Sequence, residues 1–472
     1  MKTLFWVSFF LFPLIGSGQE PELVLPEGHT SYPDKIIYHK NMDVVVTIGI
    51  SGDNTIKGWQ KKTGLLIYSV AKGAGTVYHY ESRRIATVLS DKEIVLYNMT
   101  SGNEVHRFIK ESATFFSPNF SPDGKSLLTF SVSNDSTWLD LYDSKTGILV
   151  YQTFCGKGRI ALWAYPSMLI TPDGTTVVTT TAADPRVKLW DLKTGMLRHI
   201  FSGNRSEILT FSMSPDGSNV FSYSWRDTTG FIWNLRSKKQ VAVIKPTCRL
   251  FTAFEGRFSA HNQYLVTQDQ LMPEMIGVWS VVTGKKLFEF GQGPVIMGKK
   301  HYPAKVVLSP DGNTIMYNDT GMVARILDLR TGKIRFSLRD TNGTKQTAFE
   351  TFYFSNNGKY IITKNIYRRF KVWDATTGRY LYPLGNGDIV SHVHFSVDEA
   401  YALVRDKYKI DIWEISSGVL TQQLNVKGHT SKITASCFSK DDSLLASSGN
   451  DFHIRIWNIS NGQLRNVVYG QT

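Results

Sequence analysis

The side chains that could do chemistry are scattered along this sequence rather than gathered in a known motif. Its eleven histidines include no His-Glu-x-x-His pair. The chain also has no glycine-rich phosphate loop, no Cys-x-x-Cys pair and no Gly-x-Ser-x-Gly nucleophile turn. Metal-assisted hydrolysis, nucleotide binding and acyl transfer commonly depend on such arrangements. We therefore expect no catalytic residue, no cofactor and no metal ion, and a function other than catalysis.

His392 and His394 are the pair of residues that most resembles a metal site. They alternate along an expected innermost strand, so both side chains share one face of that strand. Two ligands alone do not complete a zinc site. Packing between neighbouring sheets, with one ring nitrogen hydrogen-bonded, is the favoured alternative unless carboxylates converge on the pair.

Composition and charge limit the class of protein. A chain of 472 residues with 42% hydrophobic content can bury a large core. The formal net charge of +13 favours acidic partners, but Lys and Arg are spread along the chain. A solvated surface is therefore favoured over a nucleic-acid site. The three cysteines, Cys155, Cys248 and Cys437, allow at most one internal disulfide, and we expect buried, unpaired thiols.

The N-terminus has the features of a secretory signal. One lysine precedes a 12-residue apolar run from Leu4 to Ile15, which small residues follow. We predict that residues 1–18 are a cleaved signal peptide and that residues 19–472 are exported, to the periplasm or the extracellular space. A membrane anchor is the alternative, but the run is shorter than the roughly 20 residues of a span and contains Pro13. No later segment approaches a transmembrane span.

A repeat runs through the rest of the chain and must position these side chains. Ten times, a short alternating strand ends on a bulky residue and is followed by a polar turn, which usually closes with Thr-Gly or Ser-Gly. The bulky residues are Trp59, Tyr97, Tyr142, Trp190, Trp233, Trp279, Leu327, Trp373, Trp413 and Trp457. Their spacing of 38 to 48 residues brackets the period of a four-stranded propeller blade, about 40–45 residues. Helical periodicity is absent, so an all-β chain is expected.

A second turn signal marks the first hairpin of several repeats. Proline presets φ, aspartate can bond its own backbone, and glycine accepts a positive φ, so Ser/Thr-Pro-Asp-Gly predicts a tight turn. The pattern occurs at residues 121–124, 171–174, 214–217 and 309–312. The Thr-Gly and Ser-Gly pairs are expected to join the third strand of a repeat to the fourth for the same steric reason.

The repeat resembles the WD-repeat β-propellers. Trp190-Asp191 and Trp373-Asp374 carry the Trp-Asp signature of that family, and Gly28-His29 and Gly428-His429 carry its Gly-His signature. The resemblance covers nearly all of residues 19–472 and implies four-stranded antiparallel blades. The short leader and the Pro-Asp-Gly turns also look like those of exported bacterial WD-repeat proteins.

The resemblance also implies a buried hydrogen-bond network within a blade, which is structural rather than catalytic. The last repeat matches that network with His429, Ser447, Asp451 and Trp457. An Asp six residues before the bulky position recurs in some other repeats, but repeats six to nine carry Pro273, Gly321, Tyr367 and Lys407 there. We expect those middle blades to rely more on apolar packing between sheets.

Ten blade motifs leave two possible architectures. A single enlarged ring is favoured, because a seven-bladed ring with three extra blades would leave a large apolar sheet face in water. Such exposure costs roughly 25 cal/mol per Å². Residues 22–25 resemble an additional outer strand that could join the last blade beside residues 463–468 and tie the two ends together.

A ring of blades predicts a scaffold that presents a rigid face of loops to a protein partner. The alternative is a propeller enzyme or small-ligand binder of the quinoprotein or lyase type, with a site at the central channel. The segments that enter the innermost strands are unusually aromatic, and we predict a partner-binding patch there, with about half of its aromatic residues packed between blades. These aromatic residues are Phe115, Phe116, Trp163, Tyr165, Phe251, Phe254, Tyr302 and Phe349. The neighbouring basic residues are Arg159, Arg249, Lys299 and Lys300. The oligomeric state and the identity of the partner stay open.

Overall fold

Short runs of β-branched and aromatic residues, separated by polar turns, form the strands of this fold because such residues pack well on a pleated surface. The computed structural model describes residues 33–37, 43–49, 53–60, 66–157, 167–181, 184–224, 229–245, 254–269, 276–290, 306–318, 323–342, 345–347, 349–385, 392–396, 398–405, 409–424, 429–439, 442–451 and 453–468. Every helix or strand assigned within these residues is a β-strand, so the all-β prediction is confirmed.

The first five blades follow one another along the chain, each with four strands. Blade 1 consists of β1 (Pro33–Ile37), β2 (Val44–Gly49), β3 (Thr55–Gln60) and β4 (Leu66–Ala71). Blade 2 consists of β5 (Ala74–His79), β6 (Arg84–Ser90), β7 (Glu93–Asn98) and β8 (Glu104–Ile109). Blade 3 consists of β9 (Thr114–Phe120), β10 (Ser126–Ser133), β11 (Ser136–Asp143) and β12 (Leu149–Lys157). Blade 4 consists of β13 (Ser167–Ile170), β14 (Thr176–Thr181), β15 (Asp184–Asp191) and β16 (Leu197–Phe201). Blade 5 consists of β17 (Ile208–Met213), β18 (Asn219–Ser224), β19 (Thr229–Asn234) and β20 (Lys239–Ile244).

The remaining blades repeat this order, with one small hairpin between blades 7 and 8. Blade 6 consists of β21 (Phe254–Phe258), β22 (Tyr264–Asp269), β23 (Ile276–Ser280) and β24 (Lys286–Phe290). Blade 7 consists of β25 (Val306–Leu308), β26 (Thr314–Asn318), β27 (Ala324–Asp328) and β28 (Ile334–Leu338), and the hairpin is β29 (Asp340–Asn342) and β30 (Lys345–Thr347). Blade 8 consists of β31 (Phe349–Phe354), β32 (Tyr360–Asn365), β33 (Phe370–Asp374) and β34 (Tyr380–Leu384). Blade 9 consists of β35 (His392–Phe395), β36 (Tyr401–Arg405), β37 (Ile410–Glu414) and β38 (Val419–Leu424). Blade 10 consists of β39 (Ile433–Phe438), β40 (Leu444–Gly449), β41 (Ile454–Asn458) and β42 (Leu464–Val468).

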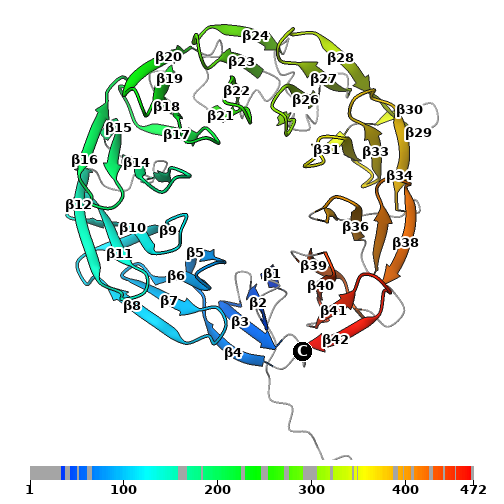
Figure 1. The fold of residues 1–472 in the computed structure, drawn as a ribbon, viewed down its shortest axis with the longest axis horizontal. Coiled ribbons are helices and arrows are strands. Elements are labelled where there is room, and N and C mark those ends of the chain that lie inside the picture. Colours follow the sequence, from blue (N-terminus) through cyan, green and yellow to red (C-terminus); the bar gives the residue numbers. More distant parts are fainter. Residues whose placement is uncertain are drawn as a thin grey trace, which may run out of the picture.

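The ten sheets form one closed ring (Figure 1). The first strand of each blade lies nearest the centre and the fourth forms the outer edge. β1 lies against β39, and Val45 and Trp59 of blade 1 share a buried apolar cluster with Leu444, Ile454 and Ile456 of blade 10. The single enlarged ring is therefore confirmed, and the seven-bladed alternative is wrong. The predicted outer strand at residues 22–25 lies outside the described residues.

A recurring hydrogen bond fixes the bulky residue of the third strand. In six blades the Trp indole donates from Nε1 to a Ser or Thr hydroxyl of the second strand at 2.8 to 2.9 Å. The pairs are Trp59 with Thr47, Trp190 with Thr179, Trp233 with Ser222, Trp279 with Thr267, Trp373 with Thr363 and Trp457 with Ser447. Each bond satisfies a buried donor that would otherwise lose its hydration without compensation.

Blade 9 breaks this rule. Val404 takes the register position that Ser447 holds in blade 10. The buried Trp413 therefore faces a side chain that cannot accept a hydrogen bond. Within the described residues, Trp413 Nε1 has no hydrogen-bond partner. This blade therefore carries an unsatisfied donor that a single substitution could satisfy.

Val404→Thr should raise the free energy of unfolding by about 1 kcal/mol, because its hydroxyl would accept from Trp413 Nε1 as the hydroxyls of other blades do. Urea unfolding followed by tryptophan fluorescence measures the change. Val178→Thr is the control, because Val178 lies in an apolar cluster with Val187 and Leu189 and should destabilise the fold when given a hydroxyl. A loss of stability in both variants would contradict the prediction.

Candidate functional site

The four residues assigned to one network lie together in blade 10. His429 precedes β39, Ser447 lies in β40, Trp457 lies in β41, and Asp451 lies in the turn between β40 and β41. His429 Nδ1 is 2.7 Å from Asp451 Oδ1, and its Nε2 is 2.9 Å from Ser447 Oγ. Trp457 Nε1 donates to Ser447 Oγ at 2.9 Å. The network therefore ties the entry loop of the blade to its second and third strands.

Ser447, His429 and Asp451 have the connectivity of a hydrolase triad, but their surroundings are those of a structural network. The Ser447 side chain is 0% exposed, and its oxygen already accepts from Trp457. A nucleophilic serine must instead reach a substrate carbonyl. Arg455 Nη1 donates to Asp451 Oδ2 at 2.8 Å, so the carboxylate is engaged on both oxygens. The series is buried and joins strands of one blade.

The charges around the network set its protonation. Burial lowers the pKa of His429; Asp451 opposes this shift, and the charges of Arg455 and His453 add to it. Burial alone would raise the pKa of Asp451, but hydrogen bonding to His429 and the charges of His429 and Arg455 hold it well below its usual range. At neutral pH the network therefore contains a neutral imidazole and an ionised carboxylate.

The stability of the ring should fall as the pH decreases from about 7.5 to about 5.5, because the unfolded His429 takes up a proton near its ordinary pKa of about 6.5. The folded His429 has a lowered pKa and does not take up that proton, so acid favours the unfolded chain. Thermal melts of the wild type and of His429→Gln across this range measure the effect. The variant should lose part of the pH dependence, and equal slopes would contradict this assignment.

Blade 8 replaces the missing repeat aspartate with one from the preceding hairpin. Tyr367 stands at the usual aspartate position, but Asp340 of β29 is buried and accepts from Lys371 Nζ at 2.6 Å and from Asn365 Nδ2 at 2.7 Å. In blade 4 the repeat position is filled by Asp184, which pairs with Lys188 at 2.6 Å. The expectation that the middle blades depend mainly on apolar packing is therefore wrong for blade 8.

The predicted aromatic patch is described only in part. Phe115 and Phe349 are 2% and 1% exposed and belong to apolar clusters, so they are core residues and not members of an exposed patch. Phe116 is half-buried against another core cluster. Trp163, Tyr165, Phe251 and Tyr302 lie outside the described residues, as does the side chain of Phe254 in β21. The neighbouring Arg159, Arg249, Lys299 and Lys300 also lie outside them.

The histidine pair and two of the three cysteines lie in strands of the propeller. His392 and His394 lie in β35, the innermost strand of blade 9, and their side chains are outside the described part. Cys155 is a buried free thiol, and burial raises its pKa to about 12. This thiol is therefore protonated and unreactive at neutral pH. Cys248 and the side chain of Cys437 fall outside the described residues.

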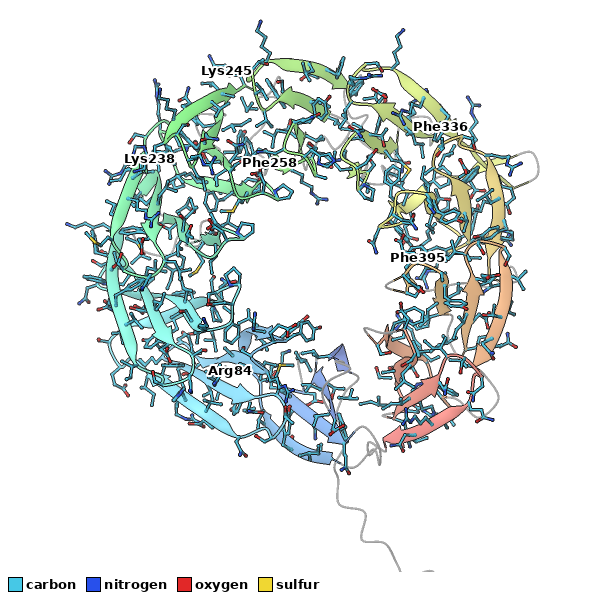
Figure 2. All side chains as sticks on the ribbon, in the orientation of Figure 1. Arg84, Lys238, Lys245, Phe258, Phe336 and Phe395 are labelled. Carbon is cyan, nitrogen blue, oxygen red and sulfur yellow. The ribbon has the colours of Figure 1, made fainter. Side chains whose placement is uncertain are left out.

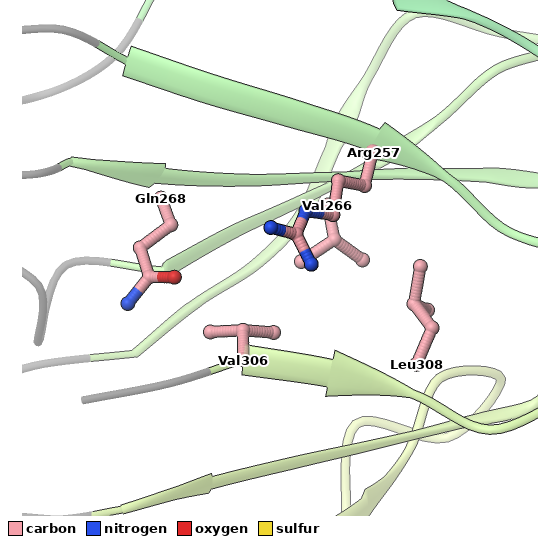
Figure 3. A pocket seen from close by; sticks show the side chains of 5 residues that line it. All are labelled: Arg257, Val266, Gln268, Val306 and Leu308. Carbon is pink, nitrogen blue, oxygen red and sulfur yellow. The ribbon is translucent and has the colours of Figure 1, made fainter. Parts of the chain in front are cut away.

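Two hollows lie between neighbouring blades. A cavity of about 10 Å³ between blades 6 and 7 has room for roughly one water molecule (Figure 3). Its lining consists of Arg257, Val266, Gln268, Val306 and Leu308. A larger groove of about 610 Å³ opens between blades 3 and 4.

The two carboxylates that line the larger groove are not free to act as a catalytic acid or base. Asp123 and Asp173 line it, but Ser121 Oγ and Thr171 Oγ1 donate to them at 2.6 Å within their own turns. These hydrogen bonds are the largest contribution that lowers the pKa of each carboxyl. The two aspartates therefore hold turns together, as their sequence pattern predicts.

One segment of the chain matches a known family of repeats. Residues 420–458 match the family model "WD domain, G-beta repeat", a segment that includes the whole His429 network. The chain is a ten-bladed β-propeller, and one segment of it is similar to the WD repeat. The match begins in β38 of blade 9 and ends in β41 of blade 10, so the sequence unit includes the outer strand of one blade and three strands of the next.

Similar curated proteins come from eukaryotes. Autophagy-related protein 16 of Arabidopsis thaliana is 22% identical over half of this chain and 43% of its own length. The guanine nucleotide-binding protein subunit beta of Solanum tuberosum is 25% identical over 39% of this chain and 54% of its own length. The human denticleless protein homolog is 21% identical over 77% of this chain and 49% of its own length. The chain thus spans about half the length of these relatives.

One face of the propeller carries two sets of turns. Because the four strands of a blade are antiparallel, the turn between strands one and two and the turn between strands three and four emerge on the same face. We call the second set the outer turns.

In the part of the chain that the structure describes, no helix is long and apolar enough to cross a membrane.

Outer turns contact the outer strand of the preceding blade. Gly284 in blade 6 has a φ of +67° and packs against Ala242 of β20, so a side chain there would meet both strain and a neighbouring strand. Gly332 in blade 7 packs in the same way against Phe288 of β24. Each of these turns therefore rests on the outer strand of the blade before it.

Proposed function

We propose that this propeller belongs to the WD-repeat proteins and is a non-catalytic scaffold that presents a rigid face of turns to a protein partner. The observation that carries the proposal is the closed ring, whose ten sheets bury apolar clusters between them while the turns remain at the surface. Turn residues can therefore vary without disturbing the core. A broad, rigid surface with variable residues fits recognition of a macromolecule better than a reaction at one point.

The relatives support this proposal at a coarse level. One of them is by name the beta subunit of a guanine nucleotide-binding protein, and a subunit works within a larger assembly. The described residues also supply no strong case for the enzyme alternative. The series that resembles a catalytic triad is buried, and the carboxylates of the larger groove are held in their own turns.

Affinity capture tests the scaffold function. The full chain, immobilised through its C-terminus, is incubated with extract from its native compartment, and retained proteins are identified by mass spectrometry. We expect a protein that saturates the immobilised chain at a fixed stoichiometry and binds again in purified form. Retention of no protein above the level of bare resin, or turnover of a small molecule by the purified chain, would contradict the proposal.

We also propose that the chain is exported with cleavage between Gly18 and Gln19. The proposal rests on the sequence pattern alone, because residues 1–32 lie outside the described part and the relatives named above are eukaryotic. N-terminal sequencing of protein recovered from the exported fraction of its native host decides the matter. A new terminus at Gln19 is expected, and intact Met1 on that protein would contradict export with cleavage.

A further inference from the structure

Basic residues recur on the outer turns of the consecutive blades 5, 6 and 7. We call this set the basic rim. It consists of Arg236, Lys238, Lys239, Lys285, Arg330 and Lys333, all of which are exposed. Figure 2 shows Lys238 on the outer edge of the ring. The three outer turns follow one another on one face of the ring, so the six cations lie on neighbouring blades.

The carboxylates near the basic rim are already engaged. Asp328 Oδ2 accepts from Arg335 at 2.6 Å, and Glu289 pairs with Lys286 at 2.8 Å. Asp216 and Asp311 each accept from a serine of their own turn. None of the six cations of the rim has an ion-pair partner within the described residues. The rim therefore keeps its positive charge for an external partner.

Two of the three turns lack the acid that opens this turn in blades 3, 4, 7 and 8. Blades 3, 4, 7 and 8 begin their outer turns with Asp143, Asp191, Asp328 and Asp374. Blades 5 and 6 begin theirs with Asn234 and Ser280, which keep a hydrogen bond to the turn, from Ser237 N at 2.8 Å and Thr283 N at 3.2 Å. Asn98 and Asn458 open the outer turns of blades 2 and 10 in the same way, so this turn geometry does not require a negative charge, and blades 5 and 6 carry none at this position.

Lys238 also occupies a costly backbone position. Its φ of +58° lies in the left-handed region, where the outer turns of blades 4, 6 and 7 place Gly195, Gly284 and Gly332. A lysine there is less stable than glycine would be. Its only hydrogen bond in the described part is a weak one of 3.3 Å to the Arg198 carbonyl, so packing does not explain the choice.

Exposed apolar side chains lie among these cations. Val282, at the tip of the outer turn of blade 6, is 79% exposed and stands between the basic turns of blades 5 and 7. Met196, on the adjoining turn of blade 4, is 69% exposed. Nucleic acids and acidic glycans would use the cations but gain little from these apolar groups, whereas protein interfaces combine both kinds of contact.

We propose that the basic rim binds an acidic segment of a protein partner in which apolar side chains alternate with carboxylates. The inference rests on the proposed scaffold function and names its partner chemistry. The carboxylates pair with the six cations, and an apolar side chain covers Val282. This surface is distinct from the aromatic patch expected at the entry to the innermost strands.

A binding assay with defined probes tests the proposal. The full chain is titrated into a fluorescein-labelled peptide of repeated Asp-Glu-Leu triplets, and anisotropy is followed. Polyglutamate, single-stranded DNA, heparin and phosphatidylserine vesicles serve as comparison probes. We expect the leucine-containing peptide to bind most tightly and to weaken as salt is raised. Equal or tighter binding of any comparison probe would overturn the assignment to an acidic protein segment, and no binding of the peptide would overturn it as well.

Matched variants locate the site. Lys239→Gln, Lys285→Gln and Lys333→Gln together should weaken peptide binding about tenfold. Lys92→Gln, Lys157→Gln and Lys432→Gln together remove the same charge elsewhere and should leave binding within about twofold. Equal effects of the two triple variants would overturn the location.

Two single variants distinguish a loss of binding from a loss of folding. Lys238→Gly should weaken peptide binding without lowering the melting temperature, because it relieves the backbone at that position. Val282→Asn should weaken binding of the leucine-containing peptide while leaving polyglutamate binding unchanged. Unchanged peptide binding in both variants would overturn the proposal.

The scaffold function and the basic rim can be contradicted by different results. If the wild type captures a protein that the rim triple variant also captures with equal affinity, the basic rim is wrong and the scaffold stands. If the wild type captures no protein, the scaffold itself fails, and the rim as a protein-binding site fails with it.

Discussion

Asp451→Ala should lower the free energy of unfolding by about 3–5 kcal/mol, because it leaves a buried guanidinium and a buried imidazole without their shared partner. Asp451 is 7% exposed and binds both His429 Nδ1 and Arg455 Nη1. The backbone N–H of Thr430 loses its acceptor as well, since it donates to Asp451 Oδ2 at 3.0 Å. Chemical unfolding followed by circular dichroism measures the loss.

Trp457→Phe provides the comparison. It removes one donor to Ser447 Oγ but leaves the charged part of the network intact, so a smaller loss of about 1–3 kcal/mol is expected. The order of the two losses is the informative result. If neither variant changes the melting temperature, the network does not stabilise blade 10 and the structural assignment fails.

The sequence predicts the blades well because their signals are local. A bulky residue at the end of the third strand and a turn with a positive φ just beyond it are separated by only a few residues. For example, Trp190 and Gly195 mark the end of β15 and its turn. The His429 network was also predictable, because its members occupy positions that the WD repeat fixes relative to one another.

The closure of the ring is harder to predict from the sequence than the blades are. It depends on contact between β1 and β39, which lie at opposite ends of the chain, and on the sum of small rotations between blades. Local patterns therefore could favour ten blades in one ring but could not determine it. The apolar cluster that contains Val45, Trp59 and Ile456 is what settles the arrangement.

The surface residues were the hardest to predict. Aromatic character drew attention to Phe115 and Phe349, yet both pack between blades, because composition does not show which face of an inner strand is buried. Asp340 was missed because a hairpin outside the repeat supplies it to blade 8. The basic rim was missed because about one blade separates its three turns in sequence, and only the order of blades in the ring places them on one face.

Ile456→Ala should lower the free energy of unfolding by about 2–5 kcal/mol, as expected for a fully buried isoleucine. Ile456 is 0% exposed and belongs to the cluster that joins blade 10 to blade 1. Ile232 is the matched control, since it also precedes the bulky Trp of its strand, is 0% exposed, and packs in the cluster that joins blades 5 and 6. Urea unfolding of both variants under the same conditions gives the comparison.

The two losses should be similar, because a closed ring has no special junction and each isoleucine is covered by the next blade. In an open arc of ten blades, Ile456 would face water, and its replacement would cost about 0.5 kcal/mol or less, while Ile232→Ala would keep its full cost. A much smaller loss for Ile456→Ala would therefore show that the first and last blades do not meet in solution. Comparable losses require that blade 1 covers blade 10, since no other described sheet lies against that face.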